Sequence, residues 1–243
     1  MRWHLVRPAK RSRRVRRVSD VGGRVDIRVV LLDIGGVMYD DSVYARSWSR
    51  ALRASGAVFE DREFDAEYAA ARAAQAGSFR RRLTERFLGP DADIEPIERL
   101  ASQTWAYPPE ALYADVLPCL EVLASRYRLG ILANQPSLVR EALGRDGIGR
   151  FMEVWGVSDD VGFAKPDPRL FAHVLYLAGE APSHVVMVGD RLDYDIRPAR
   201  MIGMRTVWVL RGEAPDEPTT EQLAEADVAV HGLRELPRVL ERL

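Results

Sequence analysis

The chain has 243 residues, of which 47% are hydrophobic and 29% are charged, and its formal net charge is −1. This composition is typical of a folded protein and excludes a chain that is disordered throughout. The single cysteine, Cys119, excludes an intramolecular disulfide and a zinc site built from thiolates. No apolar run approaches the ~18 residues of a membrane-spanning helix, so we expect no membrane partner.

The charge is divided unevenly along the chain. Residues 1–28 have a net charge of +8 and the remainder has −9. Because such a dense run of like charges cannot bury a core, we interpret residues 1–27 as a basic, disordered tail. No apolar stretch of ~7–15 residues follows the arginines, which excludes an export signal and favours a cytoplasmic protein. The acidic body argues against nucleic acid as the partner.

Short apolar runs bounded by turn residues predict parallel strands that are buried on both faces. Helical patterns lie between the later runs, at residues 136–144, 168–178, 193–202 and 233–243, and we expect Gly144, Gly179 and Gly203 to end the first three. Alternating strands and helices predict an α/β fold, a Rossmann-like parallel sheet with helices on both faces. The predicted strands are residues 29–32, 129–133, 154–157, 185–188, 206–210 and 228–230.

One region breaks this alternation. Between about residue 41 and residue 113 no convincing strand pattern occurs, and helical patterns cover residues 43–54, 64–76, 79–87 and 94–105. Asp61 and Ser78 are predicted N-caps of two of these helices. We therefore predict an all-helical cap at residues 41–114, inserted into a core formed by residues 28–40 and 115–243.

Polar residues follow the predicted strands, where the carboxyl ends of a parallel sheet bind ligands. Asp33 follows the first strand, and the stretch from Asp190 to Asp195 follows another. Lys165 is one of only two lysines in the chain and precedes a predicted helix. Carboxylates that converge without histidine or cysteine form an oxygen site that suits Mg²⁺, and a nearby ammonium suits phosphate oxygens. A carboxylate can also attack phosphorus directly.

In four segments, in the expected order, the sequence resembles the haloacid dehalogenase-like (HAD) hydrolase superfamily, in the branch with a helical cap after the first strand. The segments are Asp33-Ile34-Gly35-Gly36-Val37, Ala133-Asn134, Lys165-Pro166-Asp167-Pro168, and Gly189-Asp190 through Asp195. The resemblance covers about residues 28–243. It implies a Mg²⁺-dependent phosphatase that acts on a small phosphorylated metabolite through an aspartyl phosphate, as a monomer or a homodimer.

The resemblance also assigns roles to residues. It implies that Asp33 is the nucleophile and that Lys165 is the second catalytic residue, which neutralises the phosphoryl group. The implied metal ligands are Asp33, the backbone carbonyl of Gly35, Asp190 and Asp195. The implied phosphate-binding residues are Gly35, Gly36, Asn134 and Lys165.

Two positions depart from the family pattern. Gly35 stands where phosphatases of this family usually carry an aspartate that protonates the leaving oxygen and later activates water. Ala133 lacks the hydroxyl that usually binds phosphate. A general acid–base group is typically worth 10²–10⁴-fold in rate. These losses leave open a slow phosphatase, an enzyme whose substrate or water supplies the proton, or a non-catalytic binding protein on the same fold.

Other polar and aromatic residues have structural alternatives. Asp193 suits a helix cap, and Asn134 also suits a turn before Pro136. Trp48, Trp105 and Tyr107 suit the apolar core of the cap. The arginines of the third cap helix suit a solvated helix face, although one of them could hold an anionic group of the substrate. They are Arg80, Arg81, Arg82 and Arg86.

Overall fold

The computed structural model describes residues 26–103 and 107–243. The predicted tail therefore lies almost wholly outside the described residues, as does Trp105. Within the described ranges, no helix is both long enough and apolar enough to cross a membrane.

The core is one six-stranded sheet whose strands run parallel in the order β3-β2-β1-β4-β5-β6. β1 and β4 lie at its centre and are fully buried, as their unbroken apolar runs predict. The predicted α/β fold and all six strands are confirmed, with ends that differ by two residues at most. The strands are β1 Val29–Leu32, β2 Arg128–Ala133, β3 Met152–Val157, β4 Val185–Gly189, β5 Arg205–Val209 and β6 Val228–Val230.

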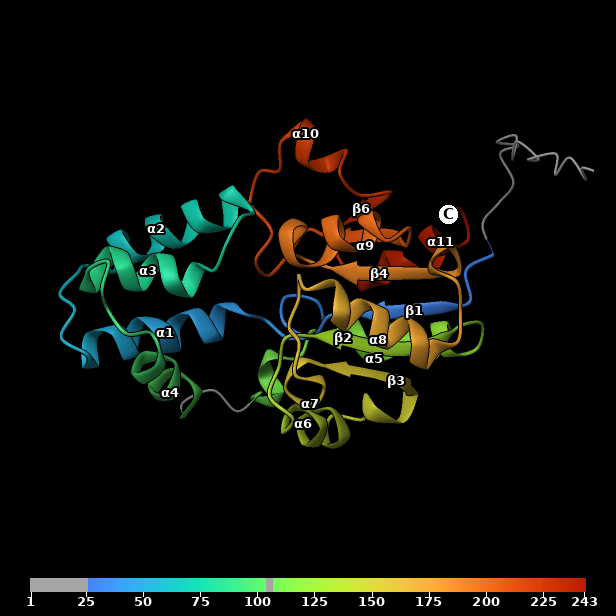
Figure 1. Cartoon of the computed structure of the whole chain (residues 1–243), viewed down its shortest axis with the longest axis horizontal. Helices are drawn as coiled ribbons and strands as arrows, with labels where there is room; N and C mark the ends of the chain where they lie inside the picture. Colours follow the sequence, from blue (N-terminus) through green and yellow to red (C-terminus); the bar gives the residue numbers. More distant parts are fainter. Residues whose placement is uncertain (1–25, 104–106) are drawn as a thin grey trace, which may run out of the picture.

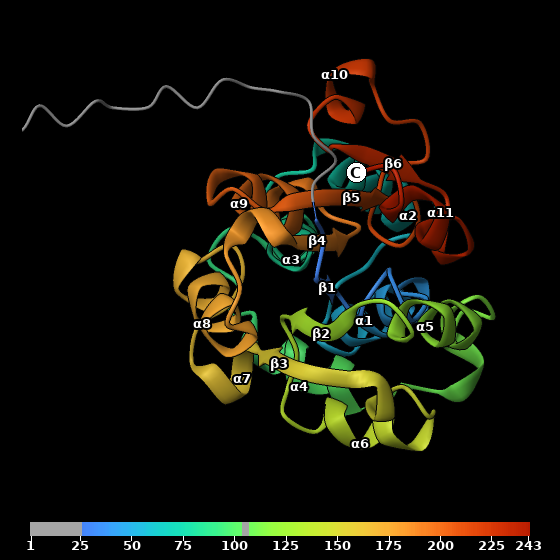
Figure 2. The ribbon, with the colours of Figure 1, turned by 90° about the vertical axis from the view of Figure 1, so that its right-hand side faces the viewer.

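Helices cover both faces of the sheet (Figure 2). On one face, α5 (Val116–Ala124), α6 (Val139–Arg145) and α11 (Leu236–Leu240) contribute to the largest apolar cluster. On the other face, α8 (Pro168–Ala178) and α9 (Arg197–Met201) bury their apolar sides against β1 and β4. The two short helices α7 and α10 span Ser158–Val161 and Thr220–Leu223.

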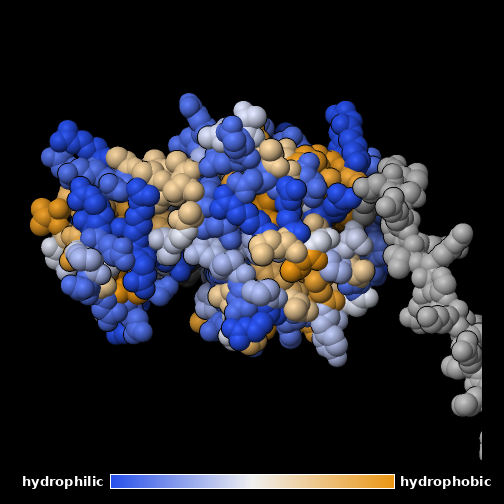
Figure 3. Space-filling view, turned by 45° about the horizontal axis from the view of Figure 1, so that its top comes forward, coloured by the Kyte–Doolittle hydropathy of each residue, from blue (hydrophilic) through white to orange (hydrophobic). Residues whose placement is uncertain are grey.

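Between β1 and β2 the chain leaves the sheet and forms an all-helical insertion, as predicted. It contains α1 (Ser42–Ala54), α2 (Asp61–Ala74), α3 (Phe79–Leu88) and α4 (Glu95–Gln103). Figure 1 shows these helices together beyond the carboxyl ends of the strands, and Figure 3 shows the insertion as a separate lobe. We call this lobe the cap.

The cap has an apolar core of its own. Trp48 and Leu83 are completely buried there, together with Phe64, Phe79 and Ile97. The expectation that Trp48 belongs to this core is confirmed. Tyr107 instead joins the cluster of the sheet, where its ring meets that of Tyr39 edge-on.

Several local predictions need correction. The N-cap of α2 is Glu60 rather than Asp61, because Glu60 and Glu63 form a reciprocal capping box. Ser78 does cap α3. Gly144 lies inside α6, which ends one residue later, and α5 had no predicted counterpart. The regular part of the helix predicted at residues 193–202 starts late, as Pro198 indicates: α9 begins at Arg197, after a wider helical turn over Leu192–Ile196.

Candidate functional site

Three aspartates lie together at the carboxyl edge of the sheet. Asp33 follows β1, Asp190 follows the neighbouring β4, and Asp195 lies in the turn after it. One carboxylate oxygen of each residue lies within 4.8 Å of the others. Pairing of Leu32 with Val188 brings the first two together across 157 positions of sequence, because parallel strands end at the same edge.

Lys165 places its ammonium between two of these carboxylates. Its Nζ lies 2.6 Å from Asp195 and 2.9 Å from Asp33, and its side chain is almost completely buried. Burial by itself lowers the pKa of Lys165, but Asp195 and Asp33 outweigh burial and raise this pKa above its usual value. The lysine is therefore charged at neutral pH and holds Asp33 in a defined orientation.

Asn134 holds the backbone of Lys165. Its side-chain amide donates to the Lys165 carbonyl at 2.8 Å, and its side-chain carbonyl accepts from the Lys165 amide at 2.6 Å. The structure thus gives Asn134 a positioning contact. A contact between Asn134 and phosphate stays a prediction.

The site carries more negative charge than the lysine neutralises. Burial raises the pKa of Asp195 to about 6, even though Lys165 and the Arg191 amide oppose this rise. Burial, followed by the Asp41, Asp195 and Asp33 carboxylates, raises the pKa of Asp190 well above its usual value. A divalent cation would relieve this repulsion, and the donors are the hard oxygens that Mg²⁺ prefers. Asp33, Asp190 and Asp195 therefore fit a metal site.

Two glycines make room for Asp190. Gly36 has a φ of +65°, and a Cβ on this residue would lie 1.9 Å from an oxygen of Asp190. A Cβ on Gly212 would lie 2.6 Å from the same oxygen. Both glycines are required by this close approach and by their positive φ. The Gly36 amide donates to the Tyr39 carbonyl at 2.9 Å, and its predicted contact with phosphate is untested.

The two positions that depart from the family pattern behave differently. Ala133 is completely buried at the end of β2 and brings no polar group to the site. Gly35 lies beside the carboxylate of Asp41, whose nearer oxygen is 2.7 Å from the position of a Cβ on Gly35. Burial, followed by the Glu213 and Asp33 carboxylates, raises the pKa of Asp41 well above its usual value.

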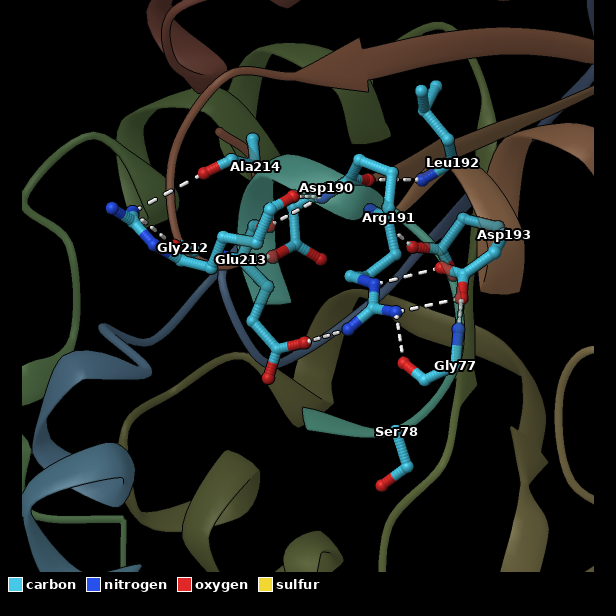
Figure 4. Close-up of polar contacts among 12 residues, drawn as sticks. Gly77, Ser78, Asp190, Arg191, Leu192, Asp193, Gly212, Glu213 and Ala214 are labelled. Carbon is cyan, nitrogen blue, oxygen red and sulfur yellow. Dashed lines mark hydrogen bonds and ion pairs between the residues drawn. The ribbon is translucent and has the colours of Figure 1, made fainter. Parts of the chain in front are cut away.

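A network around Arg191 connects the loops that carry Asp190 and Glu213 to the cap (Figure 4). The Arg191 guanidinium pairs with Asp193 at 2.8 Å and Glu213 at 2.5 Å, and it donates to the Gly77 carbonyl of the cap at 2.8 Å. Asp193 in turn accepts from the Gly77 amide at 2.8 Å. The Glu213 amide donates to Asp190 at 2.7 Å. The Asp193 side chain thus contacts the helical lobe and does not act as the N-cap of the helix that follows it.

A second set of bonds strengthens this junction. The side chain of Gln75 donates to the Glu213 carbonyl at 2.7 Å and accepts from the Leu192 amide at 2.8 Å. Arg72 pairs with Asp216 at 2.6 Å. These side chains were not predicted as functional residues. The only signal for Glu213 is its place in the polar segment that follows β5.

The cap arginines differ in their surroundings. Arg81 pairs with Glu85 within α3, and Arg82 and Arg86 both approach Glu67 of α2. These three arginines lie on an exposed face of α3, which is the structural alternative expected for them from the sequence. Arg80 pairs with Glu98 at 3.0 Å and lies over the ring of Tyr44, and its electrostatic neighbours include the Asp41 and Glu213 carboxylates. Arg80 is therefore the one of these four for which the site carboxylates are among the charged neighbours that raise its pKa.

Comparison with known proteins finds similarity to phosphatases. Phosphoserine phosphatase of Thermus thermophilus is 37% identical over 171 residues, covering 68% of this chain and 66% of that protein. Glyceraldehyde 3-phosphate phosphatase of Methanopyrus kandleri is 35% identical over 133 residues, covering 54% and 57%. The chain therefore matches less than two thirds of the length of these relatives.

A solved structure shares the fold. The HAD-hydrolase YfnB of Bacillus subtilis, described as bound to magnesium, superposes with a TM-score of 0.67 at 21% identity, over 88% of this chain and 98% of that one. The model of the family described as haloacid dehalogenase-like hydrolases matches residues 27–203. The chain therefore belongs to the haloacid dehalogenase-like hydrolases, as a homologue of phosphatases with a helical cap inserted between β1 and β2.

Proposed function

We propose that this hydrolase is a Mg²⁺-dependent phosphatase that cleaves the phosphate monoester of a small metabolite through an aspartyl phosphate on Asp33. The observation that carries the proposal is the buried cluster in which Lys165 contacts Asp33 and Asp195, with Asp190 alongside. A nucleophile, a fixed positive charge and a metal site thus share one space. Phosphoryl transfer depends mainly on such positioning and charge neutralisation.

In the proposed reaction, a carboxylate oxygen of Asp33 attacks phosphorus and the bond from phosphorus to the leaving oxygen breaks. The Lys165 ammonium contacts one Asp33 oxygen and so orients the carboxylate for attack. Its fixed charge also offsets the negative charge of the phosphoryl oxygens. Water then attacks phosphorus, the bond to Asp33 breaks, and the Asp33 carboxylate and free phosphate are released.

The metal would be held by Asp33, Asp190 and Asp195, with the Gly35 carbonyl as a further predicted ligand. When bound, Mg²⁺ supplies positive charge to the phosphoryl oxygens. The Arg191 network would keep Asp190 in place, because the Glu213 amide bonds to Asp190 while the Glu213 side chain pairs with Arg191.

The relatives support a small, anionic substrate, since they act on phosphoserine and glyceraldehyde 3-phosphate. Arg80 of the cap also supports this class, because Glu213 and Asp41 are among its charged neighbours. We propose that Arg80 contacts an anionic or polar group of the substrate outside the phosphate.

The test is phosphate release from phosphoserine, glyceraldehyde 3-phosphate and p-nitrophenyl phosphate, measured with Mg²⁺ and with EDTA. We expect turnover that EDTA abolishes and Mg²⁺ restores, and that Asp33→Asn lowers by at least ~10³-fold because the nucleophile is lost. Borohydride trapping followed by peptide mass spectrometry should locate the phosphoryl group on Asp33. The matched control is Asp65→Asn, an exposed carboxylate of α2, which should leave turnover unchanged.

The result that contradicts the proposal is equally specific. A folded protein that binds Mg²⁺ and inorganic phosphate but hydrolyses none of these esters is the non-catalytic binding protein. Turnover that survives in Asp33→Asn would place the nucleophile elsewhere.

A further inference from the structure

The space beside Gly35 is filled by the carboxyl group of another residue. A Cβ built on Gly35 would lie 2.7 Å and 2.9 Å from the two carboxylate oxygens of Asp41 and 3.1 Å from its Cγ. The φ of Gly35 lies outside the positive range that favours glycine. The backbone conformation would therefore accept other residues at position 35. The group that a side chain at position 35 would meet is the Asp41 carboxylate.

Asp41 has no evident structural task in this place. It is the N-cap residue of α1, yet its side chain makes no capping hydrogen bond. The neighbouring Asp40 performs that task, because its carboxylate accepts from the Ser42 amide at 2.9 Å. The Asp41 side chain is therefore turned away from its own helix and toward the loop that follows β1.

The surroundings of Asp41 are those of the active site. Asp33 and Glu213 contribute negative charge around it, and Arg80 of the cap contributes positive charge. The Asp41 carboxyl group therefore lies beside Gly35, two residues after Asp33, with charged groups of the site and of the cap among its neighbours.

We propose that Asp41 is the general acid and base of this hydrolase and replaces the carboxyl group that Gly35 lacks. The inference rests on the proposed phosphatase function. As Asp33 attacks phosphorus, the electron pair of the breaking bond passes to the leaving oxygen, which takes the proton of the Asp41 carboxyl group. The Asp41 carboxylate then takes a proton from the water that attacks phosphorus, and the bond to Asp33 breaks. Asp41 thus ends protonated, Asp33 ends as a carboxylate, and phosphate departs.

Neighbouring carboxylates are less suited to this task. Glu213 is held in an ion pair with Arg191, and its backbone amide bonds to Asp190. Asp40 is held by the first turn of α1. Asp41 combines a place beside Gly35 with a carboxylate free of an ion pair within the described part of the chain.

The first test uses Asp41→Asn with two classes of substrate. We expect kcat to fall by about 10²–10⁴-fold for an alkyl phosphate such as phosphoserine, whose leaving oxygen needs a proton. For p-nitrophenyl phosphate the departing phenolate needs no proton, so the first step should stay fast. The variant should then release a burst of phenolate equal to the enzyme concentration, and phosphorylated Asp33 should accumulate. Asp40→Asn, which keeps an acceptor for the Ser42 amide, is the matched control.

The second test exchanges the two positions. Gly35→Asp alone should lower turnover, because its side chain meets the Asp41 carboxylate. Combining Gly35→Asp with Asp41→Ala frees that space, and we expect kcat at least about tenfold above that of Asp41→Ala, as a partly restored acid–base group would give. This exchange tests the proposal even if Asp41→Asn folds poorly.

The outcomes separate this inference from the proposed function. If the unmodified protein hydrolyses no phosphate ester, the proposed function fails. Suppose instead that the unmodified protein is active. If Asp41→Asn then has the same turnover on both substrates, or loses turnover equally on both without a burst, Asp41 is not the acid–base group. An exchange variant without recovery would likewise contradict the claim that Asp41 replaces a side chain at position 35.

Discussion

The carboxyl edge of the sheet and its junction with the cap solve the same problem, which is to hold charged groups in fixed places, by different means. At the edge, parallel strands end side by side, so residues such as Asp33 and Asp190 meet through backbone geometry. At the junction, the long side chains of Gln75 and Arg191 reach across to backbone groups of the other lobe.

This difference shows where position is set by topology and where it is set by individual side chains. The position after a strand end is fixed by the backbone hydrogen bonds of the sheet, so it does not depend on the side chain that the residue carries. The junction depends on the particular length and hydrogen-bonding pattern of each side chain. The single side chain of Gln75 bonds to both the Glu213 carbonyl and the Leu192 amide, which lie on two separate segments of the core.

The largest expected effect is on the edge. Lys165→Met would remove the cation between Asp33 and Asp195 and leave buried carboxylates uncompensated. We expect a loss of about 3–5 kcal/mol in the free energy of unfolding at pH 7 in EDTA, measured by urea denaturation.

The control is a double variant in which Lys165→Met is combined with Asp195→Asn. Lys165→Met alone leaves the Asp195 carboxylate buried without its cation, whereas the double variant removes that carboxylate charge as well. The double variant should therefore be more stable than Lys165→Met alone. Equal stability of the two variants would mean that the buried charge is not what Lys165 compensates.

A smaller effect is expected at the junction. Arg191→Ala would leave Glu213 and Asp193 without their cation and the Gly77 carbonyl without its donor. We expect a loss of about 2–3 kcal/mol in the free energy of unfolding. Hydrogen bonds to charged groups contribute about 1.5–3 kcal/mol each, and the partly exposed Asp193 and Glu213 would regain contact with water. Proteolysis between α2 and α3 should also become faster.

The control for the junction is Arg140→Ala. Arg140 also pairs with an aspartate, Asp160, at 2.8 Å, but its side chain is 42% exposed and lies outside the junction. An exposed pair is worth about 0–1 kcal/mol, so the loss should be smaller than for Arg191→Ala. Similar losses in the two variants would show that the Arg191 network contributes no more than a surface ion pair.

The two regions also differ in how well the sequence predicts them. The edge was predictable because buried strands are short apolar runs and the polar residues of the site follow those runs directly. Asp33, Asp190 and Asp195 were selected in this way, and Lys165 was selected as one of only two lysines, placed before a predicted helix. The structure brings the four together. Their catalytic and metal-binding roles stay predictions.

The junction was not predictable by this means, because no periodic pattern distinguishes Gln75 or Arg72 from other polar helix residues. Asp41 was missed for a related reason. Two aspartates before a helix suggest an N-cap residue rather than a catalytic group. Only the structure shows that the Asp40 side chain bonds to the first turn of α1 and that the Asp41 side chain does not. The N-cap of α2 was misplaced by one residue because Asp61 suits a cap but Glu60 forms the capping box.

The smallest expected effect lies within the cap, at the start of α3. The Ser78 side chain accepts from the Arg81 amide at 3.4 Å, which is a long contact. Ser78→Ala should therefore cost about 0.5–1 kcal/mol, the lower part of the range for N-caps. Because the cap has its own apolar cluster, we expect the loss to appear locally. Hydrogen exchange should become faster for the amides at the start of α3 and stay unchanged in β1. Ser78→Gly should cost only a few tenths of a kcal/mol, since glycine is also a favourable N-cap. Equal acceleration in β1 would show instead that the cap and the sheet unfold as one cooperative unit.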